Sequence, residues 1–286
     1  MSNTGLPLYA RKAIVTIQTL QIQGANGGDS TGAGGLDLKF SVKRNLKPQP
    51  NTCDLTVFNL NAAHRSQIEQ LKTAKVQVEA GYENGTSVIF NGDLRTSLSV
   101  WDGPTVSTAL SSGDGEKAIR TARISVSVKK GSKTADVLRA IAAALGVGQG
   151  NLNAAVSKLT SAGFANLFTV GTVLTGSASR EMTNVCRSSG LTWSIQNGAL
   201  QLLPLRQFLD GTAIMLTPKT GMVGSPTVDN DGLMSVKMLM MPDVIPGRKI
   251  VIQSDRLQGQ YRIEEVTTTG DTAGTDWYHD VKGKRY

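Results

Sequence analysis

The side chains best suited to proton transfer near neutral pH are two histidines, His64 and His279. Neither lies in a Gly-x-Ser-x-Gly or HExxH motif, in which a general base would have a nucleophile or a metal to serve. Asn61 predicts the start of a short helix whose first turn contains His64 at the surface. The alternation around His279 predicts a strand on which this side chain points outward. We therefore expect both histidines to be structural, and no catalytic residue is assigned.

A second possible chemistry is glycoside hydrolysis, which needs paired carboxylates several ångström apart in a cleft. The densest acidic group near predicted turns consists of Asp93, Asp102, Asp114 and Glu116. A cell-wall hydrolase or a carbohydrate-binding module is therefore one alternative hypothesis. Aspartates in turns are usually structural, so we expect a protein that is not an enzyme.

Candidate metal and cofactor motifs are incomplete. Residues 229–232 begin like an EF-hand loop, but Met238 stands where that pattern requires a glutamate. The glycines at 146–150 follow a predicted helix, whereas a phosphate-binding loop opens one. Cys53 and Cys186 are far apart and have no CxxC context. The sequence thus predicts no cofactor, no metal site and no disulfide.

Basic residues outnumber acidic ones by 30 to 22, which gives a formal net charge of +8. Such a balance raises the possibility of a polyanionic partner. The basic residues are scattered, however, with one denser group at Lys282, Lys284 and Arg285, instead of forming a stripe interleaved with aromatic residues. We interpret the charge mainly as solvated surface charge, and a DNA-binding module is a further alternative.

Length and composition favour a turn-rich β protein. The chain has 286 residues, enough for roughly two domains of about 150 residues. It is 40% hydrophobic and 18% charged and contains 31 glycines, which suits strands joined by turns better than a helical bundle. No apolar run approaches the ~20 residues of a membrane-spanning helix, and residues 1–5 lack the pattern of a secretory signal. Synthesis in a reducing cytoplasm is the expectation.

The periodicity of apolar residues divides the chain into three parts. Residues 13–128 alternate with the period of strands, apart from the short helix at Asn61. Helical spacing follows, with a helix that ends at Gly146, a second that ends at Gly190, and a hairpin turning at Asn197-Gly198. Strands return from residue 205. The predicted fold is mainly β, α+β overall, with two β-barrel-like domains (1–130 and 205–286) and a small α+β insert (131–204) between them.

Other residues leave alternatives open. Trp101, Trp193 and Trp277 are either core anchors or hot spots of an interface. Met234, Met238, Met240 and Met241 either fill a core or line an adaptable interface. The glycine-rich loop at 24–35 is interpreted as an arm that orders on assembly.

Four stretches, taken in order, resemble the baseplate or tail hub proteins of tailed bacteriophages. They are FSVKR at 40–44 with PNTCDLTVFNL at 50–60, VEAGY at 78–82 with IFNGDL at 89–94, LSSGDGEKA at 110–118, and LTPKTGMVGSP at 216–226 followed by PGR at 246–248, GD at 270–271 and DWY at 276–278. Each stretch is a turn or a strand end, and the order and spacing of the set carry the resemblance.

The resemblance implies a structural protein of the virion that is made in the host cytoplasm. It implies a homotrimer whose two similar barrels per subunit form a pseudo-six-fold ring between the hexameric tail tube and the trimeric central spike. DNA would then be a passing cargo during ejection, and the tape measure and baseplate wedge proteins are further possible partners. A distal tail protein that caps the tube as a hexamer is the alternative within this class, and a tail-associated hydrolase or carbohydrate-binding module is less favoured.

Overall fold

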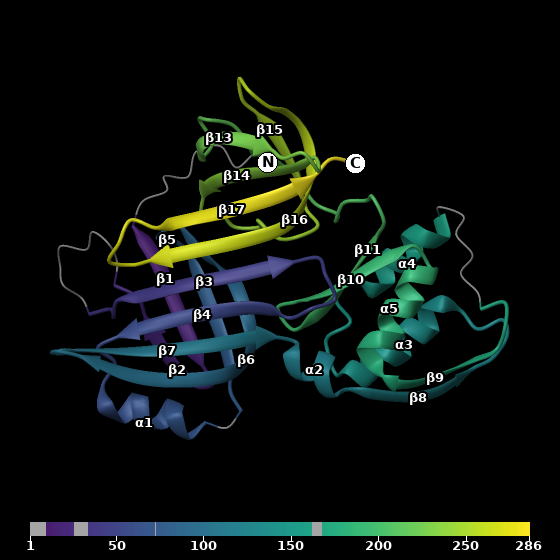
Figure 1. The fold of residues 1–286 in the computed structure, drawn as a ribbon, viewed down its shortest axis with the longest axis horizontal. Helices are drawn as coiled ribbons and strands as arrows, with labels where there is room; N and C mark the ends of the chain where they lie inside the picture. Colours follow the sequence, from purple (N-terminus) through teal and green to yellow (C-terminus); the bar gives the residue numbers. More distant parts are fainter. Residues whose placement is uncertain (1–9, 26–33, 72, 162–167) are drawn as a thin grey trace. The chain divides into compact units, whose positions relative to one another are not determined.

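The computed structural model describes residues 10–25, 34–71, 73–161 and 168–286 (Figure 1). Two compact units make up the chain. The first contains Met1–Arg44, Thr52–Gly113 and Gly211–Tyr286, and the second contains Asn45–Asn51 and Asp114–Asp210. The predicted division at residues 130 and 204 is a different partition and stays a prediction. Residues 26–33 of the loop predicted to be an arm lie outside the described residues.

One large sheet dominates the first unit. Within the described residues it has 13 strands, in the order β13-β14-β17-β16-β3-β4-β7-β6-β5-β1-β2, with β15 beside β16 and β12 beside β15 (Figure 1). Their bounds are Arg11–Ile17 (β1), Leu20–Gln23 (β2), Leu38–Asn45 (β3), Asn51–Phe58 (β4), Lys75–Tyr82 (β5), Gly85–Asp102 (β6), Thr105–Asp114 (β7), Ile214–Leu216 (β12), Met222–Val228 (β13), Leu233–Leu239 (β14), Lys249–Gln253 (β15), Gln258–Asp271 (β16) and Trp277–Lys284 (β17). The predicted mainly β fold is confirmed, and the barrel-like shape of its domains stays a prediction.

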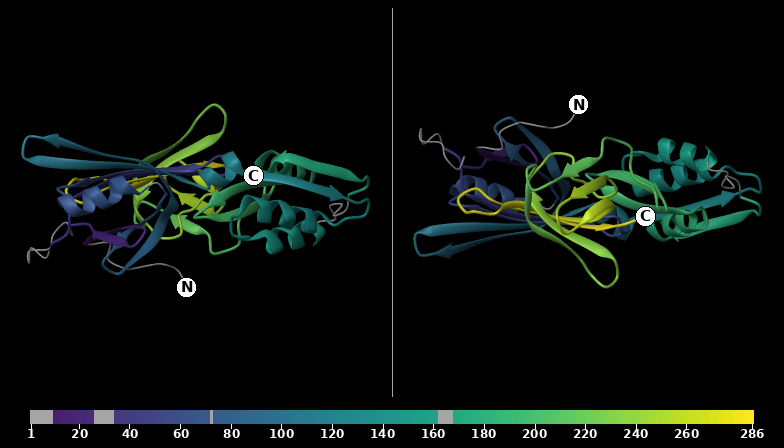
Figure 2. Two further views of the ribbon diagram at one scale, coloured as in Figure 1. Left: turned by 90° about the horizontal axis from the view of Figure 1, so that it is seen from below. Right: turned by 90° about the horizontal axis from the view of Figure 1, so that it is seen from above.

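Period-2 alternation builds this sheet, as the sequence predicts. In β3 the side chains of Leu38, Phe40 and Val42 are buried, and those between them are exposed or half-buried. The helix predicted at Asn61 is α1 (Ala62–Gln70), and the Asn61 side chain accepts a hydrogen bond from the backbone N–H of His64 at 2.8 Å. Figure 2 shows the teal-blue hairpin of β6 and β7 projecting from the rest of this unit.

Trp277 belongs to a C-terminal strand, but its ring is part of the hydrophobic core that the N-terminal strands build. The indole meets Phe40 edge to face, with the ring centroids 5.6 Å apart. Its Nε1–H donates to the Gly81 carbonyl at 3.2 Å. The guanidinium of Arg11 lies 5.7 Å from the ring centroid. The beginning of β17 is therefore anchored in the N-terminal core.

Gly270 makes this packing possible, since a Cβ at this position would lie 2.1 Å from Cζ of Phe40. We expect Gly270→Ala to lower the free energy of unfolding by roughly 1–3 kcal/mol, because the Phe40 ring would have to leave its place against Trp277. Urea denaturation measures the loss. Gly171→Ala is the matched control for the steric effect, since Gly171 does not have a positive φ and a Cβ built there lies no closer than 3.4 Å to another heavy atom. A Gly270→Ala variant as stable as the wild type would contradict the prediction.

The second unit is the α+β part of the chain. Its helices are α2 (Glu116–Thr121), α3 (Thr134–Leu145), α4 (Leu152–Ser161) and α5 (Ala178–Ser188), and its strands are β8 (Arg123–Val128), β9 (Thr172–Ser177), β10 (Leu191–Gln196) and β11 (Ala199–Pro204). β8 pairs with β9, and β10 pairs with β11. Gly146 and Gly190 end α3 and α5 with φ angles of 68° and 67°, as predicted. None of the helices in the described part of the chain is long and apolar enough to span a membrane.

Candidate interaction surface

The first unit repeats one arrangement of strands. β3 to β7 follow each other in the chain and lie in the sheet order β3-β4-β7-β6-β5. β13 to β17 lie in the order β13-β14-β17-β16, and β15 pairs with β16 as β5 pairs with β6. The first unit is thus built from two topologically equivalent halves, placed side by side in one sheet through the pairing of β16 with β3 (Figure 1).

The equivalence extends to single residues of the long strands β6 and β16. The last pair that β6 forms with β5 is Lys75↔Asp93, and the last pair of β16 with β15 is Lys249↔Arg262. In each half the ladder to the following strand then shifts register, between Leu94 and Thr96 in one and between Ile263 and Glu265 in the other. Asp93 is therefore equivalent to Arg262, and each later residue of β6 corresponds to the residue 169 positions further on.

A pair of polar side chains in contact occurs at equivalent places in the two hairpins. The Ser99 and Thr108 hydroxyls lie 3.2 Å apart between β6 and β7. The Thr268 hydroxyl lies 2.8 Å from Nδ1 of His279 between β16 and β17. The other ring nitrogen of His279, Nε2, is 3.1 Å from the Met241 carbonyl, which can only accept, so Nε2 carries the proton and Nδ1 accepts from Thr268.

His279 is a buried core residue, so the outward direction predicted for its side chain is wrong. Burial lowers the pKa of His279 to about 3, and the positive charge of Arg44 adds to this effect. The imidazole is therefore neutral at physiological pH. With both nitrogens engaged inside the sheet, this side chain supports packing and hydrogen bonding between strands.

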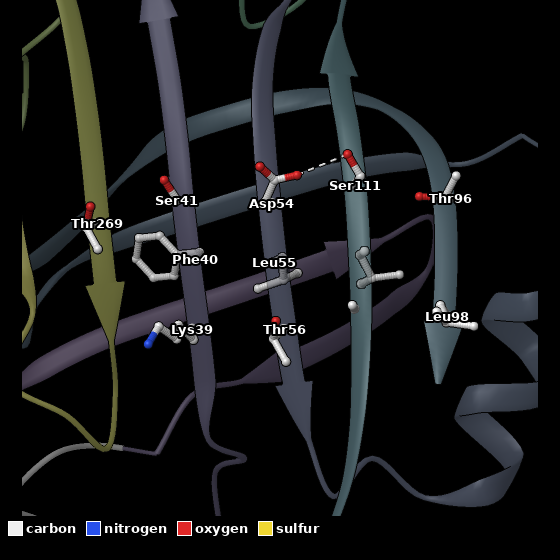
Figure 3. Close-up of a pocket in the computed structure, with 12 residues that line it drawn as sticks. Lys39, Phe40, Ser41, Asp54, Leu55, Thr56, Thr96, Leu98, Ser111 and Thr269 are labelled. Atoms are coloured by element: carbon white, nitrogen blue, oxygen red, sulfur yellow. Dashed lines mark hydrogen bonds between the residues drawn. The ribbon is translucent and has the colours of Figure 1, made fainter. Parts of the chain in front are cut away.

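The two halves share one sheet face whose side chains are exposed or half-buried, which we call the open face. On β3, β4, β7, β6 and β16 it carries Lys39, Ser41, Asp54, Thr56, Ala109, Ser111, Thr96, Leu98 and Thr269. Figure 3 shows all of these that it labels on neighbouring strands. On β13, β14 and β17 it carries Val223, Thr227, Ser235, Lys237, Asp280 and Lys282. Small polar side chains and lysines predominate on it.

A shallow groove lies on the open face in each half. The groove in the N-terminal half has a volume of about 420 Å³ and includes Asp54 and Ser111, whose side chains are joined by a hydrogen bond of 3.1 Å (Figure 3). The groove in the C-terminal half has a volume of about 370 Å³ and includes Ser235 and Lys282, which face each other across β14 and β17. Both grooves are shallow and open to solvent, unlike the enclosed cavities that bury a small molecule, and they suit contact with a macromolecule.

The acidic residues considered for hydrolysis do not form one site within the first unit. Asp93 lies 2.7 Å from the Lys75 ammonium, and Asp102 lies at the far end of β6, about 30 Å further along the strand. In the second unit, Asp114 is buried and accepts hydrogen bonds from the backbone N–H groups of Asn197 and Gly198 at 2.6 and 2.8 Å. Asp114 thus supports the hairpin turn that the sequence predicts.

Metal ligands are not gathered in the described part of the chain, where no group of three or more His, Cys, Asp or Glu side chains could hold an ion. Both cysteines are buried and unpaired with each other. Burial raises the pKa of the Cys186 thiol to about 12 and raises the pKa of Cys53 further, with the charge of Asp54 adding to the effect there.

These thiols should resist alkylation in the native protein, because the thiolate is the reactive form and neither sulfur is accessible. We expect maleimide labelling of Cys53 and Cys186 only after unfolding in urea, as measured by intact mass. Labelling of the native protein at the rate of a free peptide thiol would show that the prediction is wrong.

The tryptophans separate into core and surface. Trp193 is buried, and its Nε1–H donates to the Thr183 hydroxyl at 3.0 Å. Trp277 is buried as described above, whereas Trp101 is 66% exposed at the tip of the β6–β7 hairpin. Met234 and Met238 are buried in the core of the C-terminal strands, against which half-buried Met241 packs, and Met240 is buried in the core that the N-terminal strands build. The repeat that relates the two hairpins was not recognised from the sequence, because equivalent positions in the two hairpins are occupied by different residue types.

The fold is that of phage tail proteins. The 43 kDa tail protein of prophage MuSo2 from Shewanella oneidensis matches with a TM-score of 0.67 and 9% identity, over 96% of this chain and 97% of that one. The tail protein from Neisseria meningitidis MC58 matches with a TM-score of 0.65 and 9% identity, over 97% of each chain. The E. coli c3393 protein, a component of the type VI secretion system, matches with a TM-score of 0.57 and 9% identity, over 95% of this chain and 76% of that one. A sequence comparison with curated proteins finds no match.

The model of the family described as "Baseplate hub gp41" matches residues 15–278, and the chain belongs to this family. The predicted resemblance to phage hub proteins is thereby confirmed. The membership carries a structural role in the baseplate or tail of a bacteriophage.

Proposed function

We propose that the protein is the hub of a phage baseplate, a homotrimer that joins the hexameric tail tube to the trimeric central spike. The observation that carries this proposal is the repeat of β3–β7 in β13–β17. Three copies with two equivalent halves each supply six similar units around a three-fold axis. Such a ring matches a six-fold partner on one side and a three-fold partner on the other, which is the geometry that a symmetry adaptor needs.

The open face supports a passage for DNA through the ring. It carries charges of both signs: Lys237 pairs with Asp280 between β14 and β17, and Lys282 lies 3.3 Å from Glu265 of the adjacent strand β16. A continuous basic face would hold DNA by releasing its counterions, whereas a mixed polar face holds it weakly. DNA is thus a passing cargo in this proposal, and the virion is the place where the protein acts. A role without catalysis agrees with the separated carboxylates and the buried His279.

Light scattering after size-exclusion chromatography, with the tail-tube and central-spike proteins co-expressed, tests the proposal together with electron microscopy of the particles. We expect three copies of the chain in a ring with six similar lobes. A hexamer of this chain would favour the tube-capping distal tail protein instead. A chain that stays monomeric in the presence of both partners would overturn the hub proposal.

A further inference from the structure

The junction between the two halves shows how one hairpin tip docks on a neighbouring half. The end of β16 lies against β3, where the Thr272 N–H donates to the Leu38 carbonyl at 3.0 Å and the Leu38 N–H donates to the Thr272 hydroxyl at 2.8 Å. Beside these bonds Gly270 lies under the Phe40 ring, so close that no side chain fits there. At this junction the hairpin strand supplies the glycine and the neighbouring strand supplies the aromatic ring.

The other hairpin has the same edge without a neighbour in the described part of the chain. β5 pairs with β6 only along Gly85–Asp93, and the remainder of β6 has β7 on one side. The residue of β6 equivalent to Gly270 is Trp101, since it follows the register shift at the same distance and pairs with Val106 as Gly270 pairs with Trp277.

Large apolar side chains are exposed on this edge. Trp101 is 66% exposed, and the Arg65 guanidinium lies 4.9 Å from its ring centroid. Leu98 and Val100, on the opposite face of β6 from Trp101, are 63% and 49% exposed. A largely exposed tryptophan near other exposed apolar side chains is typical of a surface that a protein partner covers.

The strand equivalent to β3 is β13, and its register identifies the counterpart of Phe40. The Asn59 N–H donates to the Val106 carbonyl, as the Met240 N–H donates to the Trp277 carbonyl, so Val57 of β4 is equivalent to Met238 of β14. Their partners, Leu38 and Met222, are then equivalent as well.

Beyond Met222 the β13 ladder has a bulge between Val223 and Thr227, which pair with Lys237 and Ser235. The position of Phe40 in β3 is therefore occupied in β13 by the bulge residues Gly224, Ser225 and Pro226. Gly224 has a φ of +70°, and no atom lies within 4 Å of a Cβ built on it. Space is thus available beside the bulge where β3 has an aromatic ring.

We propose that Trp101 of one copy docks against the Gly224–Pro226 bulge of a second copy, in a proposal that rests on the hub ring proposed above. Compared with the junction of β16 and β3 within the chain, the large and the small residue have changed places between the hairpin and the neighbouring strand. Gly270 meets Phe40 within the chain, and Trp101 meets the glycine-containing bulge between copies. Pro226 has no N–H and the bulge interrupts the edge, so β13 does not accept a regular added strand, and the contact is made by a side chain in a recess.

This contact joins unlike surfaces, the β6 tip of one copy and the β13 bulge of the next. Contacts of that kind form rings when the rotation closes. Each copy would then be related to the next as the C-terminal half of the chain is related to its N-terminal half, and closure at three copies follows from the hub proposal.

Trp101→Glu tests the contact in the full chain, with Val173→Glu as the matched control. Val173 is 63% exposed on β9 of the second unit and has no part in the proposal. We expect Trp101→Glu to keep the wild-type circular dichroism and thermal unfolding, and to weaken trimer formation roughly thirtyfold or more, as loss of a central interface tryptophan does. Val173→Glu should associate as the wild type does. Dilution series followed by light scattering measure both.

Crosslinking tests the partner surface. A chain with Trp101→Cys and Ser225→Cys, treated with a short bismaleimide, should give covalent dimers and trimers, since Cys53 and Cys186 are buried. Val173→Cys with Ser225→Cys is the control, and should give none above background. A wild-type trimer whose Trp101 variant associates normally, or whose cysteine pair does not crosslink, would overturn this contact and leave the hub proposal standing. A wild-type chain that stays monomeric with its tube and spike proteins overturns both.

Discussion

Trp277→Ala should destabilise the first unit by roughly 3–5 kcal/mol, as expected for removal of a fully buried tryptophan. The ring is 1% exposed and fills the N-terminal core from a C-terminal strand. Its loss removes the edge contact with Phe40 and leaves the Gly81 carbonyl without the indole donor. The cavity would lie where β17 is anchored to the other half, so we expect both halves to be affected.

The exposed tryptophan of the equivalent hairpin provides the control. Trp101→Ala should change the free energy of unfolding of the monomer by no more than about 0.5 kcal/mol, because the side chain buries little surface within its own chain. Trp277→Phe keeps an aromatic ring against Phe40 and loses the hydrogen bond, so its cost should be clearly smaller than that of Trp277→Ala. Urea denaturation followed by circular dichroism measures all three. Equal losses for Trp277→Ala and Trp101→Ala would contradict the assignment of one ring to the core and the other to an interface.

Local features of the fold could be predicted because they depend on neighbours in the sequence. Asn61 caps α1, Gly146 ends α3, and Asn197-Gly198 turns the β10–β11 hairpin with positive φ angles at both residues. Each of these needs only a few adjacent residues. The short helix α2 was not predicted, because Gly115 was interpreted as part of a turn, and this turn residue also starts the helix.

The pairing of β16 with β3 could not be predicted, because it joins residues such as Leu38 and Thr272 that are 234 positions apart. No local sequence pattern distinguishes a strand that pairs only within its hairpin from a strand that also joins the two halves. The repeat was hidden as well, since Ser99 and Thr108 in one hairpin correspond to Thr268 and His279 in the other. Polarity is kept at these positions, although Ser99 is half-buried and the other three residues are buried, and only the register makes the equivalence visible.

The candidate surface was predicted in part. Trp101 was recognised as either a core anchor or an interface residue, and exposure decides for the surface. The acidic residues were chosen because they are dense near predicted turns. In the structure Asp93 forms an ion pair with Lys75, and Asp114 accepts hydrogen bonds from the backbone of a hairpin turn. Density along the chain does not bring side chains together when a strand as long as β6 separates them.

The stability of the first unit should fall as the pH is lowered from about 6.5 toward 3, because His279 is buried in its neutral form. Its pKa is about 3 in the folded protein and about 6.5 when unfolded, so the unfolded state binds the additional proton throughout this interval. The contribution is fully present above pH 6.5 and is lost with a slope of about 1.4 kcal/mol per pH unit, to an extent of order 4 kcal/mol by pH 3.

Carboxylates also titrate in this range, so the effect of His279 must be taken as a difference. His279→Gln keeps a polar side chain that can reach Thr268 or the Met241 carbonyl but cannot take up a proton. At pH 7 it should be less stable than the wild type by roughly 1–3 kcal/mol, since the native pair of hydrogen bonds is imperfectly replaced. With falling pH the wild type should lose stability faster, and the two curves should converge. Urea denaturation at a series of pH values measures the difference, and parallel curves would mean that His279 is not held neutral by its burial.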